Sequence, residues 1–277
     1  MTSVPLAVTL AAAAWIVAAV VMAALWAWHL HSKNAAVVGA GWTALVATFA
    51  VIYGAQASGM PGRRLAIASM MGSWGARLTV YLLYDRVFGR PEDGRYTDLR
   101  RRLGARAHAW FFWFFQAHAA MAVFFSLPAL LAATNPNPEF APIELAAVGL
   151  WIVAFSGETT ADRQLLAFRS NPENGGRTCR AGLWRFSRHP NYFFEWLMWV
   201  ACALFAVASP WGWIALACPL VMLYLLFTVA GVTGIPATEA QALRSRGADY
   251  RQYQATTSAF VPWFPRRSAE RPADAVT

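Results

Sequence analysis

The sequence predicts an all-α protein that crosses a membrane with seven helices. Of its 277 residues, 58% are hydrophobic and 14% aromatic, whereas only 13% are charged. Soluble domains carry about 25% charged residues, so this balance indicates a polytopic membrane protein. Apolar runs near the roughly 20 residues that a helix needs to cross a bilayer recur along the whole chain. The expected spans are residues 5–29, 35–56, 64–84, 109–133, 140–160, 191–209 and 211–232.

The first span and the last two have the clearest boundaries. Residues 5–29 lack a preceding basic segment and are too long for the core of a signal peptide, so we expect a retained helix. Pro190 suits the first turn of the sixth span, where its missing N–H costs nothing. Only Ser209 and Pro210 separate the last two spans, which predicts a tight hairpin. We see no repeat or second soluble domain and expect one membrane domain over residues 1–277, with a flexible tail at 266–277.

Arginines in the loops predict the orientation. All but one of the 23 basic residues are arginines, and most follow the third, fifth and seventh spans. These are Arg86, Arg90, Arg95, Arg100, Arg101, Arg102 and Arg106; Arg163, Arg169, Arg177, Arg180, Arg185 and Arg188; and Arg244, Arg246, Arg251, Arg266, Arg267 and Arg271. With seven spans, the positive-inside rule places the N-terminus outside and the C-terminus in the cytoplasm. Arg63 and Arg64, after the second span, are the exception.

Several functional classes find no support in the sequence. The net charge of +9 comes from arginines between apolar spans, which fits membrane orientation and anionic ligands rather than nucleic acid. Three cysteines without C-x-x-C spacing offer neither a disulfide framework nor a metal cluster. No Rossmann or P-loop glycine motif is present. The histidines have no ligand spacing, so we expect no metal site.

The third span carries a polar stripe at helical spacing, formed by Trp74, Arg77, Tyr81 and Tyr84. A lipid-facing charge in mid-span costs about 2.5–3.5 kcal/mol on insertion scales, so we expect Arg77 to face the bundle. Its anion would be either Glu195 or a bound pyrophosphate. The alternative is an arginine that snorkels to the membrane interface.

The fifth and sixth spans add carboxylates, an amide and arginines. Glu158, Asp162, Leu165 and Arg169 share one helical face, as do Asn191, Glu195, Met198 and Trp199. Carboxylates at the C-terminal end of a helix oppose its dipole, so they fit a bound group with hydroxyls or amides. The loop 171–180 is rich in turn residues, and its arginines could meet phosphates. An amphipathic extension on the membrane surface, or a basic helix end, is the alternative. Together the three helices predict a cavity that faces the cytoplasm.

Five segments of the chain resemble the steroid 5α-reductase family, in its bacterial branch. They are Trp74-Gly-Ala-Arg-Leu78, Glu92-Asp-Gly-Arg-Tyr96 with Arg100, Asp162 through Arg169, Leu183-Trp-Arg-Phe-Ser-Arg-His-Pro-Asn-Tyr192 with Glu195, and Tyr253-Gln-Ala-Thr-Thr-Ser-Ala-Phe-Val-Pro-Trp-Phe-Pro265. The Arg-His-Pro-Asn-Tyr piece alone is weak, because membrane methyltransferases of the isoprenylcysteine and phospholipid type have a similar signature. The tail motif and the Glu-Asp-x-Arg-Tyr loop make the resemblance more specific.

The resemblance implies a membrane reductase that uses NADPH to saturate the 4,5 double bond of a 3-oxo-Δ4-steroid-like enone. It implies a cofactor-binding part over about residues 74–265. The residues expected to bind the cofactor are Arg77, Tyr81, Asp162, Arg169, Arg188, His189, Asn191, Tyr192, Glu195 and Trp199. The hydrophobic substrate would enter from the bilayer. We expect the bacterial inner membrane, with the cofactor site facing the cytoplasm.

The chain departs from the family at the groups that polarise the ketone. Animal members use a carboxyl-bearing residue on the second helix and a tyrosine one turn before the arginine of the third. Here Trp74 occupies the tyrosine position and the second span has no carboxylate. Tyr53, Gln56 and Trp74 are therefore the catalytic candidates. Two other functions stay open: an S-adenosylmethionine-dependent membrane methyltransferase, and a non-catalytic lipid-binding protein.

Overall fold

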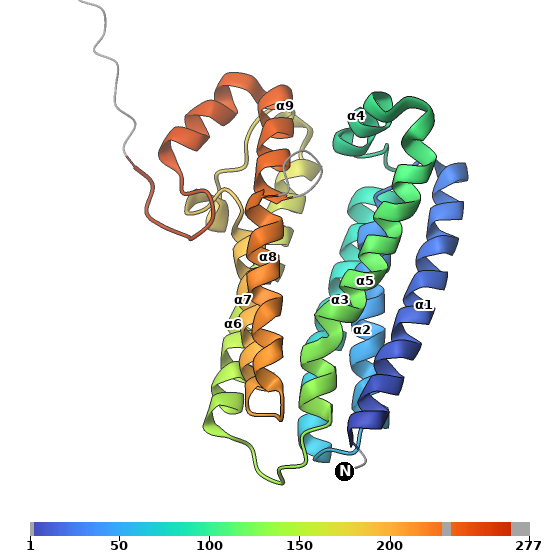
Figure 1. Cartoon of the computed structure of the whole chain (residues 1–277). Helices are drawn as coiled ribbons and strands as arrows, with labels where there is room; N and C mark the ends of the chain where they lie inside the picture. The colour runs from blue at the N-terminus through green and yellow to red at the C-terminus, as the bar shows by residue number, and fades with distance from the viewer. Residues whose placement is uncertain (1–2, 229–233, 267–277) are drawn as a thin grey trace, which may run out of the picture. The chain divides into compact units, whose positions relative to one another are not determined.

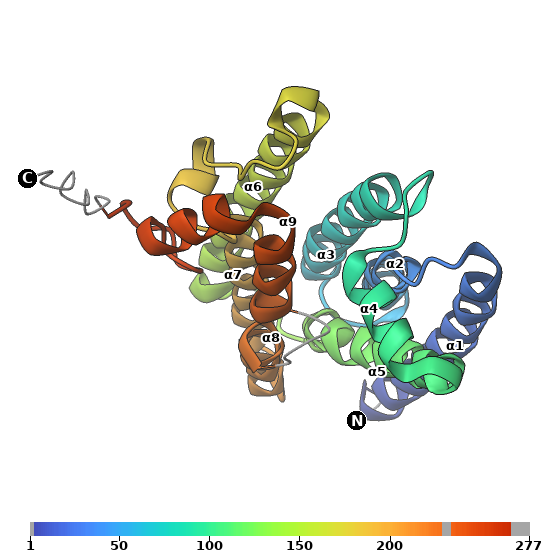
Figure 2. The ribbon, with the colours of Figure 1, turned by 90° about the horizontal axis from the view of Figure 1, so that it is seen from above.

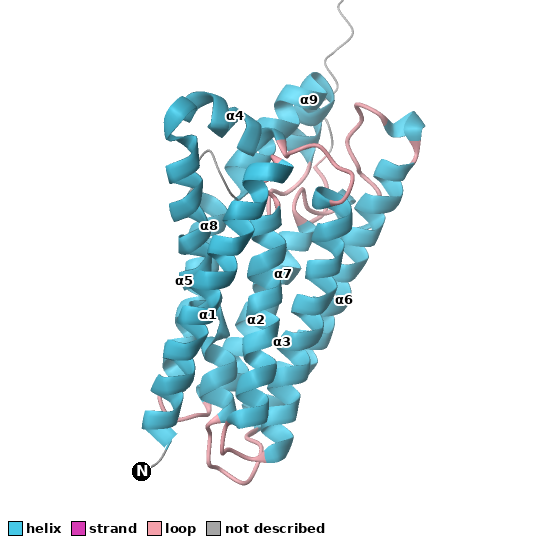
Figure 3. Ribbon diagram, turned by 90° about the vertical axis from the view of Figure 1, so that its right-hand side faces the viewer, coloured by secondary structure: helices cyan, strands magenta, loops and turns pink. Residues whose placement is uncertain are grey.

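The described part of the chain, residues 3–228 and 234–266 of a computed structural model, is helical throughout. Figure 3 shows helices joined by loops and no strand among these residues, and the nearest approach to a sheet is an isolated bridge between Ser187 and Ser258. The chain forms two compact units. The first comprises residues 1–153 and 197–224, and the second residues 154–196 and 225–277.

Four long helices make the core of the first unit (Figures 1 and 2): α1 (Ser3–Ser32), α2 (Val37–Gln56), α3 (Pro61–Leu82) and α5 (Ala107–Ala133). Helix α2 lies between α1 and α3, and α5 contacts all three. Small residues allow α2 and α3 to approach closely. A Cβ added at Gly75 would lie 2.6 Å from Ala47 Cβ, and one at Gly54 would lie 2.7 Å from Ala68 Cβ. This is the small-residue packing of membrane helices.

The arginine-rich segment after α3 is an ordered structure. A π-helical turn, η1 (Leu83–Val87), leads to α4 (Gly94–Leu103), which a short 3-10 turn joins to α5. Asp93 caps α4 by accepting from the Arg95 amide at 3.0 Å and from the Arg95 guanidinium. Glu92 accepts from the Ala35 amide at 3.0 Å and pairs with Arg100 at 2.8 Å. The Glu-Asp-x-Arg-Tyr motif therefore fastens this segment to the turn between α1 and α2.

Arg63 and Arg64 are not loop charges. The side chains of Arg63 and Glu144 are both 0% exposed and pair through two hydrogen bonds, 2.5 and 3.0 Å long. The Arg63 guanidinium also donates to the carbonyls of Asn137 and Glu139. Arg64 donates to the carbonyls of Gly54 and Ala55 at the end of α2. Both arginines are thus used inside the protein, which explains why they depart from the loop pattern.

The remaining helices are α6 (Pro142–Ser170), α7 (Pro190–Val207), α8 (Ala217–Thr228) and α9 (Gly234–Thr256). A helix thus begins or runs within each of the seven expected spans, although residues 229–232 of the last span lie outside the described residues. Among the described residues, five helical stretches are long and apolar enough to cross a membrane: Leu6–Ser32, Val37–Gln56, Gly94–Ala133, Pro142–Ser170 and Pro190–Val207. Helix α3 carries three arginines and α8 is short, so the count of seven stays a prediction.

The second unit holds most of the polar loops. It contains the last part of α6, the turns η3 (Pro172–Asn174) and η4 (Gly182–Arg185), the start of α7, and α9. Helix α9 is kinked at Gly247, whose φ of 52° is in the left-handed region that glycine favours. The sequence had indicated only a basic tail after the seventh span and no helix at the position of α9. Residues 267–277 of the expected flexible tail are outside the described residues.

Candidate functional site

The motif that begins at Leu183 is held against α6 in the second unit. The Trp184 indole donates to the carbonyl of Ala161 at 2.9 Å, and Gln164 accepts from the Leu183 amide at 2.9 Å. Gly182 permits this contact, because a Cβ there would lie 2.2 Å from the Gln164 amide nitrogen. The turn η4 is therefore fixed on α6 before α7 begins.

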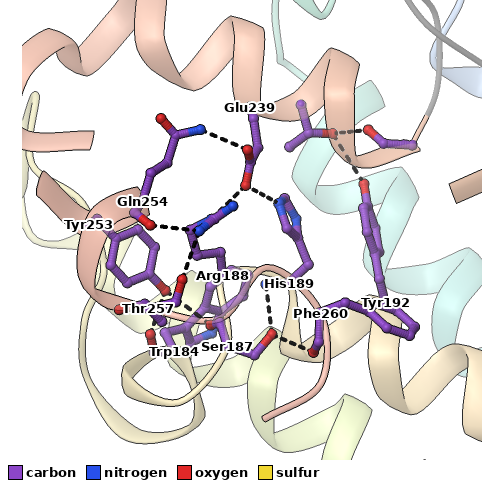
Figure 4. Close-up of polar contacts among 12 residues, drawn as sticks. Trp184, Ser187, Arg188, His189, Tyr192, Glu239, Tyr253, Gln254, Thr257 and Phe260 are labelled. Carbon is purple, nitrogen blue, oxygen red and sulfur yellow. Dashed lines mark hydrogen bonds and ion pairs between the residues drawn. The ribbon is translucent and has the colours of Figure 1, made fainter. Parts of the chain in front are cut away.

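Arg188 and Glu239 form the centre of a polar network (Figure 4). Arg188 Nε lies 2.6 Å from Glu239 Oε1, and its Nη1 donates to the carbonyls of Gln254 and Thr257. The Gln254 side chain donates to Glu239 Oε2 at 2.7 Å, and His189 Nε2 lies 3.2 Å from Glu239 Oε1. One carboxylate from α9 thus gathers three side chains.

The electrostatics of this network favour a neutral histidine beside a charged pair. Burial would raise the pKa of Glu239, but hydrogen bonds from His189, Arg188 and Gln254 outweigh it and lower that pKa to about 2. Burial is the main cause that lowers the pKa of His189, against the opposing effect of Glu239. At neutral pH the imidazole is therefore uncharged, and its Nε2–H donates to the carboxylate.

The tail motif 253–265 is strapped onto the same segment. The Tyr253 hydroxyl donates to the carbonyls of Trp184 and Ser187. Ser187 Oγ donates to the carbonyl of Phe260 at 2.7 Å, and the Arg188 amide donates to that of Ser258 at 2.8 Å. Figure 4 shows the contacts of Tyr253 and of the Ser187 side chain. The two motifs, about 70 residues apart in sequence, are therefore joined into one structural element. We call residues 256–266, which pack on the motif that begins at Leu183, the strap.

Asp162 and Asn191 approach each other at the start of α7. Asn191 Nδ2 lies 3.3 Å from Asp162 Oδ1, and Asp162 is only 3% exposed. Glu158, one turn earlier on α6, is also buried, so this face is not an amphipathic surface extension. Glu195 is partly buried on the same face of α7 as Asn191. A carboxylate beside an amide can hold hydroxyl or carboxamide groups.

Two arginines of the second unit act on each other. Burial, with repulsion from Arg169, lowers the pKa of Arg246, and its guanidinium lies 5.0 Å above the ring of Tyr250. Arg169 is exposed near the end of α6. Two guanidinium groups that repel each other suit an anion that both can bind.

The remaining candidate of the second unit is Tyr192. Its ring stacks on that of His189 at 5.4 Å, and its hydroxyl lies 3.4 Å from that of Thr238.

The first unit contains a cluster of tryptophans. The rings of Trp74 and Trp199 lie 5.1 Å apart, and Trp42 lies 5.8 Å from Trp74 and 6.3 Å from Trp199. Trp74 and Trp199 are at most 2% exposed. The indole nitrogens of all three are buried and find no acceptor within the described residues. The narrow gap beside them is lined by Met71, Trp74, Trp151, Met198, Trp199 and Cys202.

The other candidates of the first unit are spread along α2 and α3. Tyr53 is buried, with its hydroxyl 3.4 Å from Ser126 Oγ, whereas Gln56 is exposed at the end of α2. Arg77 and Tyr81 are partly buried on α3. Tyr84 was expected on their stripe but is 70% exposed, because the π-helical turn begins at Leu83 and changes the register there.

Among the candidates predicted from sequence, the structure brings Asp162 to Asn191 and Trp74 to Trp199. It brings the neighbouring residues Arg188 and His189 to Glu239. It missed Glu239, Gln254 and Trp42 as members of the sites. Glu239 carried a usable signal, because it is the first carboxylate after Glu195 and follows an apolar span. Trp42 had none, since one more tryptophan in an apolar span looks like packing.

The fold and these sites define a helical membrane protein with a buried cluster of indole donors and a polar network built on a basic, aromatic motif. The chain belongs to the family described as "Protein of unknown function (DUF1295)", whose model matches residues 25–257. That family is associated with steroid 5α-reductase-like membrane proteins. Comparison with curated proteins gave no match, and neither did comparison with solved structures.

Proposed function

We propose that this chain is a membrane-embedded, NADPH-dependent reductase that saturates the 4,5 double bond of 3-oxo-Δ4-steroid-like enones. The observation that carries the proposal is the tryptophan cluster. Trp74 occupies the position at which the resembled family has a tyrosine, and its buried N–H has no acceptor among the described residues. Buried donors normally have a partner, so a donor left open in an apolar site suits a substrate oxygen.

The chemistry requires such a donor. NADPH supplies a hydride when bound. Addition of hydride to the β carbon of an enone would move negative charge onto the ketone oxygen, and a proton taken up from water at the α carbon would complete the saturated ketone. A fixed donor in an apolar site stabilises that charge more than water does, because it needs no reorganisation during the reaction. An indole N–H donates a hydrogen bond but accepts none, so Trp74 and its neighbours favour a carbonyl over a hydroxyl group.

The polar residues fit the other partner in the reaction. Asp162, Asn191 and Glu195 provide the carboxylate and amide groups that ribose and a carboxamide need. Arg169 and Arg246 provide the planar donors that bind phosphates through two hydrogen bonds. The polar atoms of Arg188, His189 and Tyr192 already contact Glu239 and Thr238 of α9, so these three residues would support the cofactor site by holding α9 in place. We include Arg77, Tyr81 and Trp199 as further cofactor-binding residues.

The proposal includes the placement in the membrane. Seven spans, with the N-terminus outside and the C-terminus in the cytoplasm, put the arginine-rich segments on the cytoplasmic side of a bacterial inner membrane. Because Arg63 and Arg64 are used inside the protein, they do not argue against this orientation. A steroid-like substrate would reach the tryptophans from the bilayer.

Cofactor binding and turnover test the proposal separately. In detergent, NADPH should raise the melting temperature, while NADH should do so much less and S-adenosylmethionine not at all. Stabilisation by S-adenosylmethionine alone would favour the methyltransferase function. NADPH oxidation should depend on an added 3-oxo-Δ4-steroid such as progesterone. A protein that binds steroid without turnover would be the non-catalytic lipid-binding protein instead.

Two variants divide the roles. Trp74→Phe should lower kcat about a hundredfold, the order of effect of losing one donor to an oxyanion, and leave NADPH affinity unchanged. Asn191→Ala should weaken NADPH binding. Trp113→Phe, at an exposed tryptophan of α5, is the matched control and should change neither. Full turnover in Trp74→Phe would remove the indole from the mechanism.

A further inference from the structure

A hollow of about 460 Å³ opens beside the strap and is not used by the proposed reaction. Its lining residues are Arg188, Gln254, Ala255, Thr256, Thr257, Ser258, Ala259, Val261, Trp263, Phe264 and Arg266. The volume lies in the range of sites that bind small molecules, about 300–1,000 Å³. All of these residues belong to the second unit.

The strap is packed against the start of a candidate membrane span. The Phe260 ring lies 5.5 Å from that of Phe193, 5.9 Å from that of Trp196 and 5.3 Å from that of Phe227. Phe193 and Trp196 are in the first two turns of α7, which is long and apolar enough to span the bilayer from Pro190 onward. The hollow therefore lies close to the first turns of a candidate membrane span.

Three of the lining residues are apolar and exposed. Val261 is 53% exposed, Trp263 69% and Phe264 76%. Three adjacent large apolar side chains of this kind are costly in water, but aromatic residues are enriched where membrane helices meet the interface. There, acyl chains and the glycerol region of a lipid can cover them.

Other lining residues are polar and positive. Arg188 and Arg266 line the hollow with the hydroxyl-bearing residues Thr257 and Ser258, and within the described ranges no carboxylate lines it. Arg188 is already held by Glu239 and two carbonyls. The Arg266 guanidinium makes no ion pair or hydrogen bond within the described ranges, although its amide donates to the carbonyl of Thr256. The charge therefore favours an anion.

We propose that this hollow binds the headgroup of an anionic phospholipid. The phosphate would take hydrogen bonds from Arg266 and the strap hydroxyls, and the acyl chains would pass over Val261, Trp263 and Phe264. Exposed apolar side chains beside two arginines, next to the start of a candidate membrane span, match an amphipathic anion rather than a soluble one. This inference does not depend on the reductase activity.

Native mass spectrometry of the full-length protein, released from neutral detergent, tests it. Phosphatidylglycerol and phosphatidylcholine are titrated separately, and the bound fraction of each is measured. Phosphatidylglycerol should bind more tightly. Arg266→Gln should weaken it about tenfold, as expected for one charge-assisted hydrogen bond, and leave phosphatidylcholine binding unchanged. Trp263→Ser should weaken both lipids.

Two matched controls keep the test specific. Arg251→Gln removes an exposed arginine of α9 outside the hollow, and Trp113→Ser removes a tryptophan of α5 with the same 69% exposure. Neither should change lipid binding. Melting temperatures in lipid-free detergent should match wild type in all four variants, because every changed side chain is exposed.

Competition distinguishes the possible anions. Glycerol phosphate and inorganic phosphate should not displace phosphatidylglycerol, because they lack the acyl chains. Displacement by either would overturn the lipid assignment in favour of a site for soluble phosphate. Displacement by NADPH would assign the hollow to the cofactor. An unchanged preference for phosphatidylglycerol in Arg266→Gln would also overturn the proposal.

Discussion

The Arg63–Glu144 pair of the first unit and the Arg188–Glu239 pair of the second are the same chemical pair in two settings. Both side chains of the first are 0% exposed, against 12% and 14% in the second. Around the first pair, the remaining hydrogen bonds within the described residues involve backbone groups of Asn137, Glu139 and Ala141. Around the second, Glu239 also serves His189 and Gln254.

The difference separates a structural clamp from a site that can respond. A bidentate pair whose other donors end on backbone carbonyls holds one geometry. A carboxylate shared with a histidine changes its contacts when the histidine gains a proton. The second pair also borders the hollow beside the strap. Burial alone therefore does not say what an ion pair does; the identity of its remaining partners decides.

The largest expected effect is on the clamp. Glu144→Gln keeps the shape but leaves a buried guanidinium without its counter-charge, so we expect a loss of about 3–5 kcal/mol in the free energy of unfolding. Thermal or denaturant unfolding in detergent measures it. Glu139→Gln is the control, because only the backbone carbonyl of Glu139 contacts Arg63. Equal stability of the two variants would show that the pair does not hold the fold.

Glu239→Gln should cost less. Arg188 keeps its bonds to the carbonyls of Gln254 and Thr257, so we expect the local free energy of unfolding to fall by about 1–3 kcal/mol. Faster amide exchange in the strap would report it. Asp249→Asn breaks the exposed pair with Arg180 and should leave the strap unchanged. A strap that stays protected in Glu239→Gln would mean that backbone contacts alone hold it.

Acid should loosen the strap in two stages. The pKa of His189 lies below its ordinary 6.5, so the unfolded state binds more protons and stability falls as the pH drops below 6.5. The pKa of Glu239 is lowered to about 2, so its contribution is full above 4.5 and is lost as the pH falls towards 2. Amide exchange against pH measures both. His189→Gln should remove the upper stage only, and a single unchanged transition would contradict this assignment.

The smallest expected effect is at Tyr192. Its hydroxyl lies 3.4 Å from that of Thr238, a long contact, so Tyr192→Phe should change the free energy of unfolding by about 0.5 kcal/mol or less. The strap should be as protected as in wild type. If stability is unchanged but NADPH affinity falls, Tyr192 touches the cofactor rather than the network. A large loss of stability would extend the network beyond the Arg188–Glu239 pair.

The helices could be predicted from sequence because apolar length and turn residues are local signals. The partners of the arginines could not. Glu144 is 81 residues from Arg63 and Glu239 is 51 from Arg188, and no short-range pattern links them. Arg63 therefore looked like a loop charge. Helix α9 was missed because a polar, arginine-bearing helix lacks the apolar run that marks a span.

Members of the candidate sites could be predicted where helical spacing places residues on one face of a helix. Asp162 and Asn191 were both named and do meet. Spacing failed at Tyr84, where a π-helical turn changes the register. It also could not show that the Trp42, Trp74 and Trp199 nitrogens lack acceptors in the described structure, because that depends on how three helices pack.

Transfer of an isotope label tests the central claim most directly. The purified protein is incubated with a 3-oxo-Δ4-steroid and NADPH that carries deuterium on the transferring face of its nicotinamide ring. We predict a saturated 3-oxo product with deuterium on the former β carbon, formed by wild type and Trp113→Phe and strongly reduced in Trp74→Phe. Bound NADPH and steroid without any deuterated product would contradict the reductase function.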